Sequence, residues 1–91
     1  MMIGFTGDYC LPCQVMKPWL AELKREHARA VDVVVVNLDR KKNQRFRSLL
    51  NSETVPTQVF VGPSGRIEAR QAGLLTREQM TTTFRRLGWI R

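Results

Sequence analysis

The chain has 91 residues, the size of one small domain, and we treat residues 1–91 as a single unit. Hydrophobic residues make up 43% and charged residues 25%, as in an ordinary globular protein. No apolar run approaches the roughly 18 residues that a membrane span requires, so we expect no membrane insertion. The formal net charge of +7 favours acidic partners without identifying one.

The densest group of basic residues comprises Arg40, Lys41, Lys42, Arg45 and Arg47. It lacks the run of interleaved aromatic residues on which a single-stranded nucleic acid would stack. We therefore expect a solvated helix face here and no specific nucleic-acid partner.

The first residues, Met1 to Phe5, lack the basic stretch, the apolar core and the small-residue cleavage site of a secretory signal peptide. As given, the chain is expected in the cytoplasm. If a leader has been removed from a precursor, a periplasmic or exported location would apply instead.

The first half of the chain predicts a strand, a helix and a second strand. Residues 2–6 are mostly apolar and lead into the turn-prone Gly7-Asp8. From Leu11 to His27 the apolar residues recur at spacings of three and four, which predicts a helix with one face on a core. Residues 31–36 contain five valines, which predicts a parallel strand that is covered on both faces and central in the sheet.

The second half predicts a short helix followed by a hairpin. Apolar residues at helical spacing within 46–50 indicate the helix. Residues 57–61 are expected to form a strand, 62–65 a turn, and 66–72 an antiparallel return strand.

A last helix is predicted from Thr76, which forms a capping box with Gln79 three residues later. Met80 and Phe84 line one face of this helix, and Gly88 ends it. The element order is therefore βαβαββα, an α/β fold with a central mixed four-stranded sheet flanked by helices.

The two cysteines of the chain, Cys10 and Cys13, are separated by Leu11 and Pro12, a spacing that permits a reversible disulfide. Cys10 begins the predicted helix, where unpaired N–H groups and the helix dipole stabilise a thiolate and lower its pKa. Cys10 is therefore the expected nucleophile. Cys13, one turn further along, is the expected resolving thiol that attacks a mixed disulfide.

Three alternatives to thiol–disulfide exchange remain open. Two cysteines can be half of a zinc site, but a closed site needs four ligands and His27 is the one histidine. A cluster shared between two chains would also use such a pair. The cysteines could instead be inert in a redox-silent binding or adaptor module that docks a partner through its basic surface.

Five features occur in an order that resembles the thioredoxin family, in its minimal form without an extra N-terminal strand and helix. These features are Cys10-Leu11-Pro12-Cys13 opening a helix, Pro18 within that helix, Asn37-Leu38-Asp39 after the valine strand, Val55-Pro56-Thr57, and Gly73 after the hairpin. The resemblance runs nearly end to end and implies a thioredoxin-like fold.

The resemblance implies substrate-binding roles for three residues outside the cysteine motif. The peptide bond before Pro56 would be cis and Pro56 would pack beside the disulfide, whereas the residues alone predict a trans bond. The main chain of Val55 would pair with an extended substrate. Gly73 would let the substrate backbone come close.

Residues of the motif itself are also implied in substrate binding. Tyr9 stands where the family usually has tryptophan, so it would cover the site and contact substrate, or else be a half-buried rim residue. Leu11 and Pro12 would belong to the same surface. This pair resembles the Gly-Pro of reductants more than the Pro-His of oxidants, which favours reduction.

Two departures from the family concern charged groups. Gly4 occupies the position of a buried aspartate, and Val35 that of a lysine. The proton of Cys13 would therefore go to water, to Asp8 or to another group. The resemblance implies a protein disulfide oxidoreductase that acts on disulfides or thiols of other proteins. It would exchange electrons with an upstream thiol reductase or oxidant, and would work as a monomer without a bound cofactor or metal.

Overall fold

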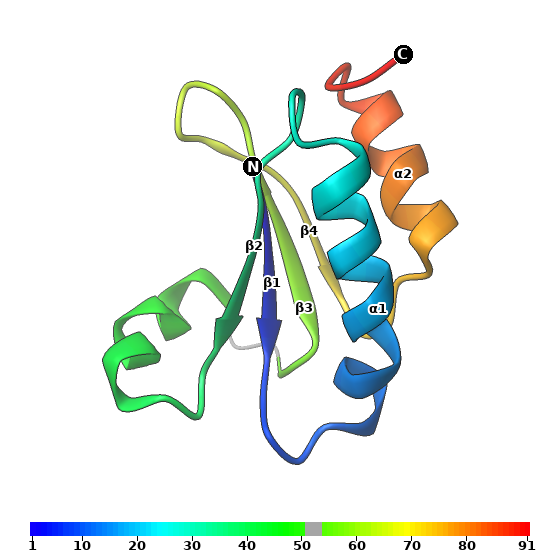
Figure 1. Cartoon of the computed structure of the whole chain (residues 1–91). Helices are drawn as coiled ribbons and strands as arrows, with labels where there is room; N and C mark the ends of the chain where they lie inside the picture. The colour runs from blue at the N-terminus through cyan, green and yellow to red at the C-terminus, as the bar shows by residue number, and fades with distance from the viewer. Residues whose placement is uncertain (51–53) are drawn as a thin grey trace.

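A four-stranded sheet with helices on both faces forms the structure, a computed structural model that describes residues 1–50 and 54–91 (Figure 1). The elements in chain order are β1 (Met2–Thr6), α1 (Leu11–Glu26), β2 (Val33–Asn37), the 3₁₀-helix η1 (Lys41–Leu50), β3 (Thr57–Val61), β4 (Ile67–Ala72) and α2 (Arg77–Arg86). The predicted order βαβαββα is confirmed, with η1 as its second helix.

The sheet has the strand order β2-β1-β3-β4. β1 runs parallel to β2 and antiparallel to β3, and β4 runs antiparallel to β3. The sheet is therefore mixed, as predicted. This arrangement brings the ends of β1, β2 and β4 and the beginning of β3 to the same edge.

The valine strand β2 is an edge strand, so the prediction of a central strand covered on both faces was wrong. Its pairing with β1 is parallel, as predicted, but Val34 and Val35 are 37% and 49% exposed. The central strands are β1 and β3. β-branched residues favour extended backbone wherever a strand lies, so the valine run identified a strand without determining its place in the sheet.

Side chains of the central strands alternate between two hydrophobic clusters. Met2 and Phe60 belong to the cluster formed with α1 and α2, which also contains Phe84. Phe5 and Val59 belong to the cluster on the opposite face, where η1 lies. Each face of the sheet therefore has its own core, with α1 and α2 on one side and η1 on the other (Figure 1).

The second helix begins earlier than predicted and is a 3₁₀-helix. Leu50 is buried, and Phe46 and Leu49 are partly buried against the same cluster. A spacing of three residues suits 3₁₀ geometry as well as the α-helix, so the apolar pattern alone did not distinguish them.

The predicted capping box at the start of α2 is confirmed. The Thr76 side chain accepts a hydrogen bond from the Gln79 N–H at 3.1 Å, and the Gln79 side chain accepts one from the Thr76 N–H at 2.9 Å. Arg77 then forms ion pairs with Glu22 and Glu26 of α1. The capped end of α2 is thereby attached to α1.

Replacing the capping residue, Thr76→Ala, is expected to lower the free energy of unfolding by about 1 kcal/mol because it leaves a helix N–H without its partner. Urea denaturation followed by circular dichroism measures this loss. Thr82→Ala is the matched control, because Thr82 is exposed within α2 and alanine favours a helix there. Equal losses in both variants would contradict a capping role.

Candidate active site

Cys10 and Cys13 form a disulfide at the N-terminus of α1, with their Cα atoms 5.2 Å apart. Cys10 is the N-cap residue in an extended conformation, and its Sγ accepts a hydrogen bond from the Cys13 N–H at 3.2 Å. Cys10 is 9% exposed and Cys13 is 3% exposed. The outer sulfur therefore belongs to the cysteine predicted as nucleophile, and the inner one to the predicted resolving cysteine.

The start of α1 favours negative charge on Cys10. The first turn of this helix contains no acidic residue, and its dipole places partial positive charge at the N-terminus. The N–H that reaches Cys10 Sγ in the disulfide can also donate to a thiolate after reduction. Pro12 lies in the same turn and supplies no N–H, so it reduces the number of donors available.

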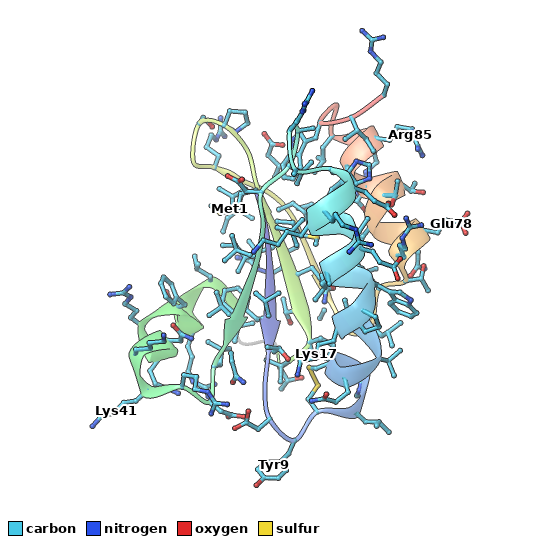
Figure 2. All side chains as sticks on the ribbon, viewed as in Figure 1. Met1, Tyr9, Lys17, Lys41, Glu78 and Arg85 are labelled. Carbon is cyan, nitrogen blue, oxygen red and sulfur yellow. A yellow bond between two sulfur atoms is a disulfide. The ribbon has the colours of Figure 1, made fainter. Side chains whose placement is uncertain are left out.

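The outer rim of the site is formed by Tyr9, Leu11 and Pro12, which are all exposed. Tyr9 lies at the tip of the turn before Cys10 and points away from the rest of the protein (Figure 2). It is fully exposed, so it neither covers the disulfide nor forms a half-buried rim. Because the turn between β1 and α1 projects beyond the sheet, this side chain finds nothing to pack against.

The segment around Pro56 lies at the same edge of the sheet. The Val55–Pro56 peptide bond is cis, and Pro56 is buried. The Gly73 N–H donates to the Pro56 carbonyl at 2.8 Å, with Gly73 at a φ of +87° that favours glycine. The structure thus brings together Val55, Pro56 and Gly73, three of the residues predicted as substrate-binding.

A buried glutamine in β3, Gln58, hydrogen-bonds to the main chain at the end of β4, next to Gly73. Gln58 is fully buried in β3. When its side-chain NH₂ faces the end of β4, this group donates to the carbonyls of Gln71 at 2.9 Å and Gly73 at 3.1 Å. A buried amide is stabilised only when it is hydrogen-bonded, so these contacts hold the end of β4 against β3. The sequence analysis did not identify Gln58, because its burial depends on the pairing of both strands.

Asp8 attaches the turn before Cys10 to the segment that follows β2. Its carboxylate accepts hydrogen bonds from Asn37 Nδ2 at 2.9 Å and from two Arg40 nitrogens at 3.0 Å. The Asp8 N–H donates to Asp39 Oδ2 at 2.5 Å. The hydrogen bonds from Asn37 and Arg40 lower the pKa of Asp8 below its ordinary value. At neutral pH Asp8 is ionised and is a poor base, which argues against it as the proton acceptor for Cys13.

A small apolar cavity of about 20 Å³ lies beside Cys13. Gly4 and Val35 are paired across β1 and β2 and both line it, together with Lys17 and Gln58. No carboxylate among the described residues lines this cavity. The departure at Gly4 therefore leaves Cys13 without a neighbouring acid in the part of the chain that is described.

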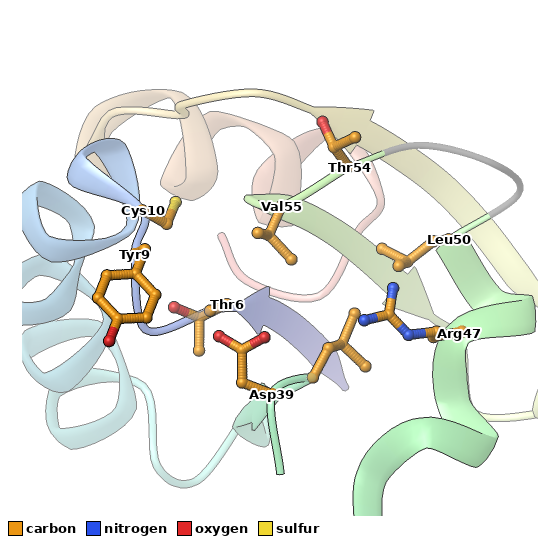
Figure 3. A pocket seen from close by; sticks show the side chains of 10 residues that line it. Thr6, Tyr9, Cys10, Asp39, Arg47, Leu50, Thr54 and Val55 are labelled. Atoms are coloured by element: carbon orange, nitrogen blue, oxygen red, sulfur yellow. The ribbon is translucent and has the colours of Figure 1, made fainter. Parts of the chain in front are cut away.

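A larger cleft of about 310 Å³ opens beside Cys10 (Figure 3). It lies between the turn carrying Tyr9, the Val55 segment and η1, and its lining includes Asp39 and Arg47. Val55 Cγ2 and Asp39 Oδ2 approach Gly7 so closely that an added Cβ would meet them at 3.3 and 3.2 Å. Glycine at this position therefore keeps the wall of the cleft close to Cys10.

The described residues contain no cluster of three or more histidine, cysteine or acidic side chains placed to hold a metal ion. Within residues 1–50 and 54–91, no helix has the length and apolar character needed to cross a membrane.

A family model described as Thioredoxin matches residues 1–86. The chain belongs to the thioredoxin family. It is a thiol–disulfide oxidoreductase. This conclusion rests on the Cys10–Cys13 disulfide and on relatives that are named for this activity.

Two relatives and one solved structure illustrate the match. Thioredoxin of Haemophilus influenzae is 30% identical over 80 residues, which are 88% of this chain and 72% of the relative. Thiol-disulfide oxidoreductase ResA of Oceanobacillus iheyensis is 26% identical over 88% of this chain and 53% of its own length, so this thioredoxin-family chain spans about half of that relative. Oxidised thioredoxin O2 of Arabidopsis thaliana has a similar fold, with a TM-score of 0.78 and 24% identity over 94% of this chain and 72% of that one.

The sequence analysis missed two arginines of this thioredoxin-family site. Arg40 binds Asp8, 32 residues away, and Arg47 lines the cleft beside Cys10. Both belong to the basic group that we expected to be a solvated face. Local spacing contained no signal for either, because Asp8 and Arg40 meet through the pairing of β1 with β2, and the cleft forms only where the turn carrying Tyr9, the Val55 segment and η1 come together.

Removing the arginine partner, Arg40→Gln, is expected to raise the pKa of Asp8 toward its ordinary value of 3.8, since two of its hydrogen bonds are lost. Titration of the Asp8 carboxyl by NMR measures the change. Lys41→Gln removes the same charge at the next position, where the side chain is exposed, and should leave the Asp8 titration almost unchanged. Equal shifts in both variants would indicate a general charge effect.

The same contact predicts a pH dependence of stability. Because folding lowers the pKa of Asp8, its contacts stabilise the protein above the unfolded value of 3.8, and this contribution disappears as the pH falls through the folded value. Asp8→Asn should therefore be less stable than the wild type at neutral pH and approach it in acid. Urea denaturation across this pH range tests the prediction, and a difference independent of pH would contradict it.

Proposed function

We propose that this protein reduces disulfides of other proteins, with Cys10 as nucleophile and Cys13 as resolving thiol. The observation that carries the proposal is the position of the disulfide. It lies at the N-terminus of α1, at the sheet edge where the Val55-Pro56 segment and Gly73 also meet. One chain provides both cysteines and both flanking segments, so the reaction requires only a monomer.

Substrate would bind as an extended segment beside Val55. This residue precedes β3, whose ladder begins at Thr57, so its main chain lies outside the paired part of the strand. An extended peptide can pair with such a main chain as an added strand. The exposed Tyr9, Leu11 and Pro12 would offer apolar contact on the other side of the disulfide.

The reaction begins with both cysteines reduced. The Cys10 thiolate attacks one sulfur of the substrate disulfide, forming a mixed disulfide and releasing the other substrate sulfur as a thiolate. Cys13 then loses its proton and attacks Cys10 Sγ, which releases the second substrate thiolate and leaves the Cys10–Cys13 disulfide. Two electrons pass to the substrate, and an upstream thiol reductase restores the dithiol.

The residues between the cysteines support reduction rather than oxidation as the proposed direction. Strong oxidants of this fold have a strongly stabilised reduced form. Leu11 and Pro12 carry no charge that would stabilise the Cys10 thiolate, and Pro12 removes one N–H donor from the first turn of α1. The thiolate therefore depends on few donors, which lowers the oxidising power of the disulfide.

A redox titration against defined thiol–disulfide buffers, with free thiols counted by alkylation, tests the direction of electron flow. The midpoint is expected nearer −270 mV than −120 mV, the approximate potentials of reducing and oxidising members of this fold. A midpoint at the oxidising end would overturn the proposed direction. Absence of a two-electron transition would overturn the redox function.

The roles of the two cysteines predict different variant behaviour. Cys10→Ser should abolish reduction of a disulfide-bonded fluorogenic peptide with dithiothreitol as electron donor, because the attacking sulfur is gone. Cys13→Ser should still attack but accumulate the mixed disulfide, which mass spectrometry detects. Turnover retained by Cys10→Ser, or a trapped adduct on Cys13 in place of Cys10, would contradict the assigned roles.

A further inference from the structure

We propose that the cleft beside Cys10 is a subsite for an acidic side chain of the substrate, bound by Arg47. The inference rests on the proposed reduction of protein disulfides and specifies which disulfides are preferred. Substrates with a glutamate two residues from the attacked cysteine would be reduced fastest.

The cleft lies where the side chain two positions from the attacked cysteine would be placed. Its volume of about 310 Å³ adjoins both Cys10 and Val55, the two residues that would contact the reacting sulfur and the substrate main chain. Along an extended segment, side chains two residues apart project on the same face about 7 Å from each other. A residue two positions from the substrate cysteine can therefore enter the cleft while the cysteine meets Cys10.

Arg47 is held in place at the η1 side of the cleft. Gln44 donates through Nε2 to the Leu38 carbonyl and accepts the Arg47 Nε–H through Oε1 at 2.7 Å. One side chain thus anchors η1 to the end of β2 and orients the guanidinium, which Figure 3 shows beside Leu50. Within residues 1–50 and 54–91 no ion pair or hydrogen bond occupies the two terminal nitrogens of Arg47, which can bind a carboxylate in a bidentate manner.

The cleft has a carboxylate, Asp39, near one end and a guanidinium, Arg47, at the other. Asp39 lies at the end near Thr6 and Tyr9, where its Oδ2 accepts the Asp8 N–H. This carboxylate disfavours a substrate carboxylate beside it. No carboxylate of the described residues lies within ion-pair distance of Arg47. An acidic group is therefore favoured at the η1 end and disfavoured at the Cys10 end.

The remaining walls suit the stem of a glutamate. Leu38, Leu50 and Val55 also line the cleft. The methylene groups of glutamate can pack on these apolar side chains while the carboxylate reaches Arg47. A lysine in the same position would place its ammonium against the Arg47 guanidinium and be disfavoured.

The test compares fluorogenic disulfide peptides that differ only in the residue two positions before or after the attacked cysteine, with glutamate, glutamine or lysine there. For the wild type, kcat/KM should be about fivefold higher for glutamate than for glutamine at one of the two positions, the size expected for a partly exposed ion pair. The preference should decrease as salt is added.

Arg47→Gln should abolish the glutamate preference, Arg47→Lys should retain part of it, and Arg47→Glu should favour lysine instead. Arg45→Gln is the matched control, since it removes the same charge from η1 at a residue whose guanidinium lies over the Phe46 ring, 4.8 Å from its centroid. This variant should keep the preference. Because each result is a ratio to the glutamine peptide, a general loss of activity does not imitate the effect.

Two results would overturn the subsite. One is equal kcat/KM for all peptides with the wild type. The other is an equal loss of preference in Arg45→Gln and Arg47→Gln, which would assign the effect to total charge. Failure of the proposed function gives a different result, in which no peptide, including the glutamine peptide, is reduced.

Discussion

Pairing of β1 on both sides is the constraint on which the arrangement of the site depends. β1 hydrogen-bonds to β2 in parallel and to β3 in antiparallel register, so the end of β1 and the beginning of β3 lie at one edge of the sheet. The chain leaves β1 into the turn before Cys10 and enters β3 through cis-Pro56. The turn with Cys10 and the Val55-Pro56 segment therefore lie at the same edge of the sheet. The helix η1 lies near this edge as well, because it follows β2, which runs parallel to β1.

The three arginines near this edge, Arg40, Arg45 and Arg47, each make a different contact. Arg40 neutralises Asp8 and attaches the turn before Cys10, while Arg45 lies over Phe46 and Arg47 lines the cleft. Asp8 thus serves as an anchor whose charge is balanced by a neighbouring cation. The N-terminus of α1, with no acidic residue in its first turn, is left to stabilise the sulfur of Cys10.

The inner side of the disulfide is arranged differently from the outer side. Cys13 adjoins a small apolar cavity that is lined by Gly4 and Val35, which pair across β1 and β2, and by the polar residues Thr6, Lys17 and Gln58. When its side-chain NH₂ faces β4, Gln58 donates to the carbonyls of Gln71 and Gly73. The site therefore combines an outer sulfur that accepts a hydrogen bond from the Cys13 N–H with an inner sulfur beside an apolar cavity.

The sequence by itself determined the local features: the cysteine pair at a helix start, the hairpin, and the Thr76–Gln79 capping box. The cysteine pair and the capping box join residues three positions apart, and the hairpin joins two strands that are consecutive in the chain, so each depends on local sequence. The cis bond at Pro56 came from resemblance to a family, because the residues alone favour trans. Only the tertiary structure decided that β2 is an edge strand, that Arg40 binds Asp8 and that Arg47 faces the cleft. The Asp8–Arg40 contact joins residues 32 positions apart, and the cleft brings η1 to the turn before Cys10, so both depend on strand order and register, which local patterns do not encode.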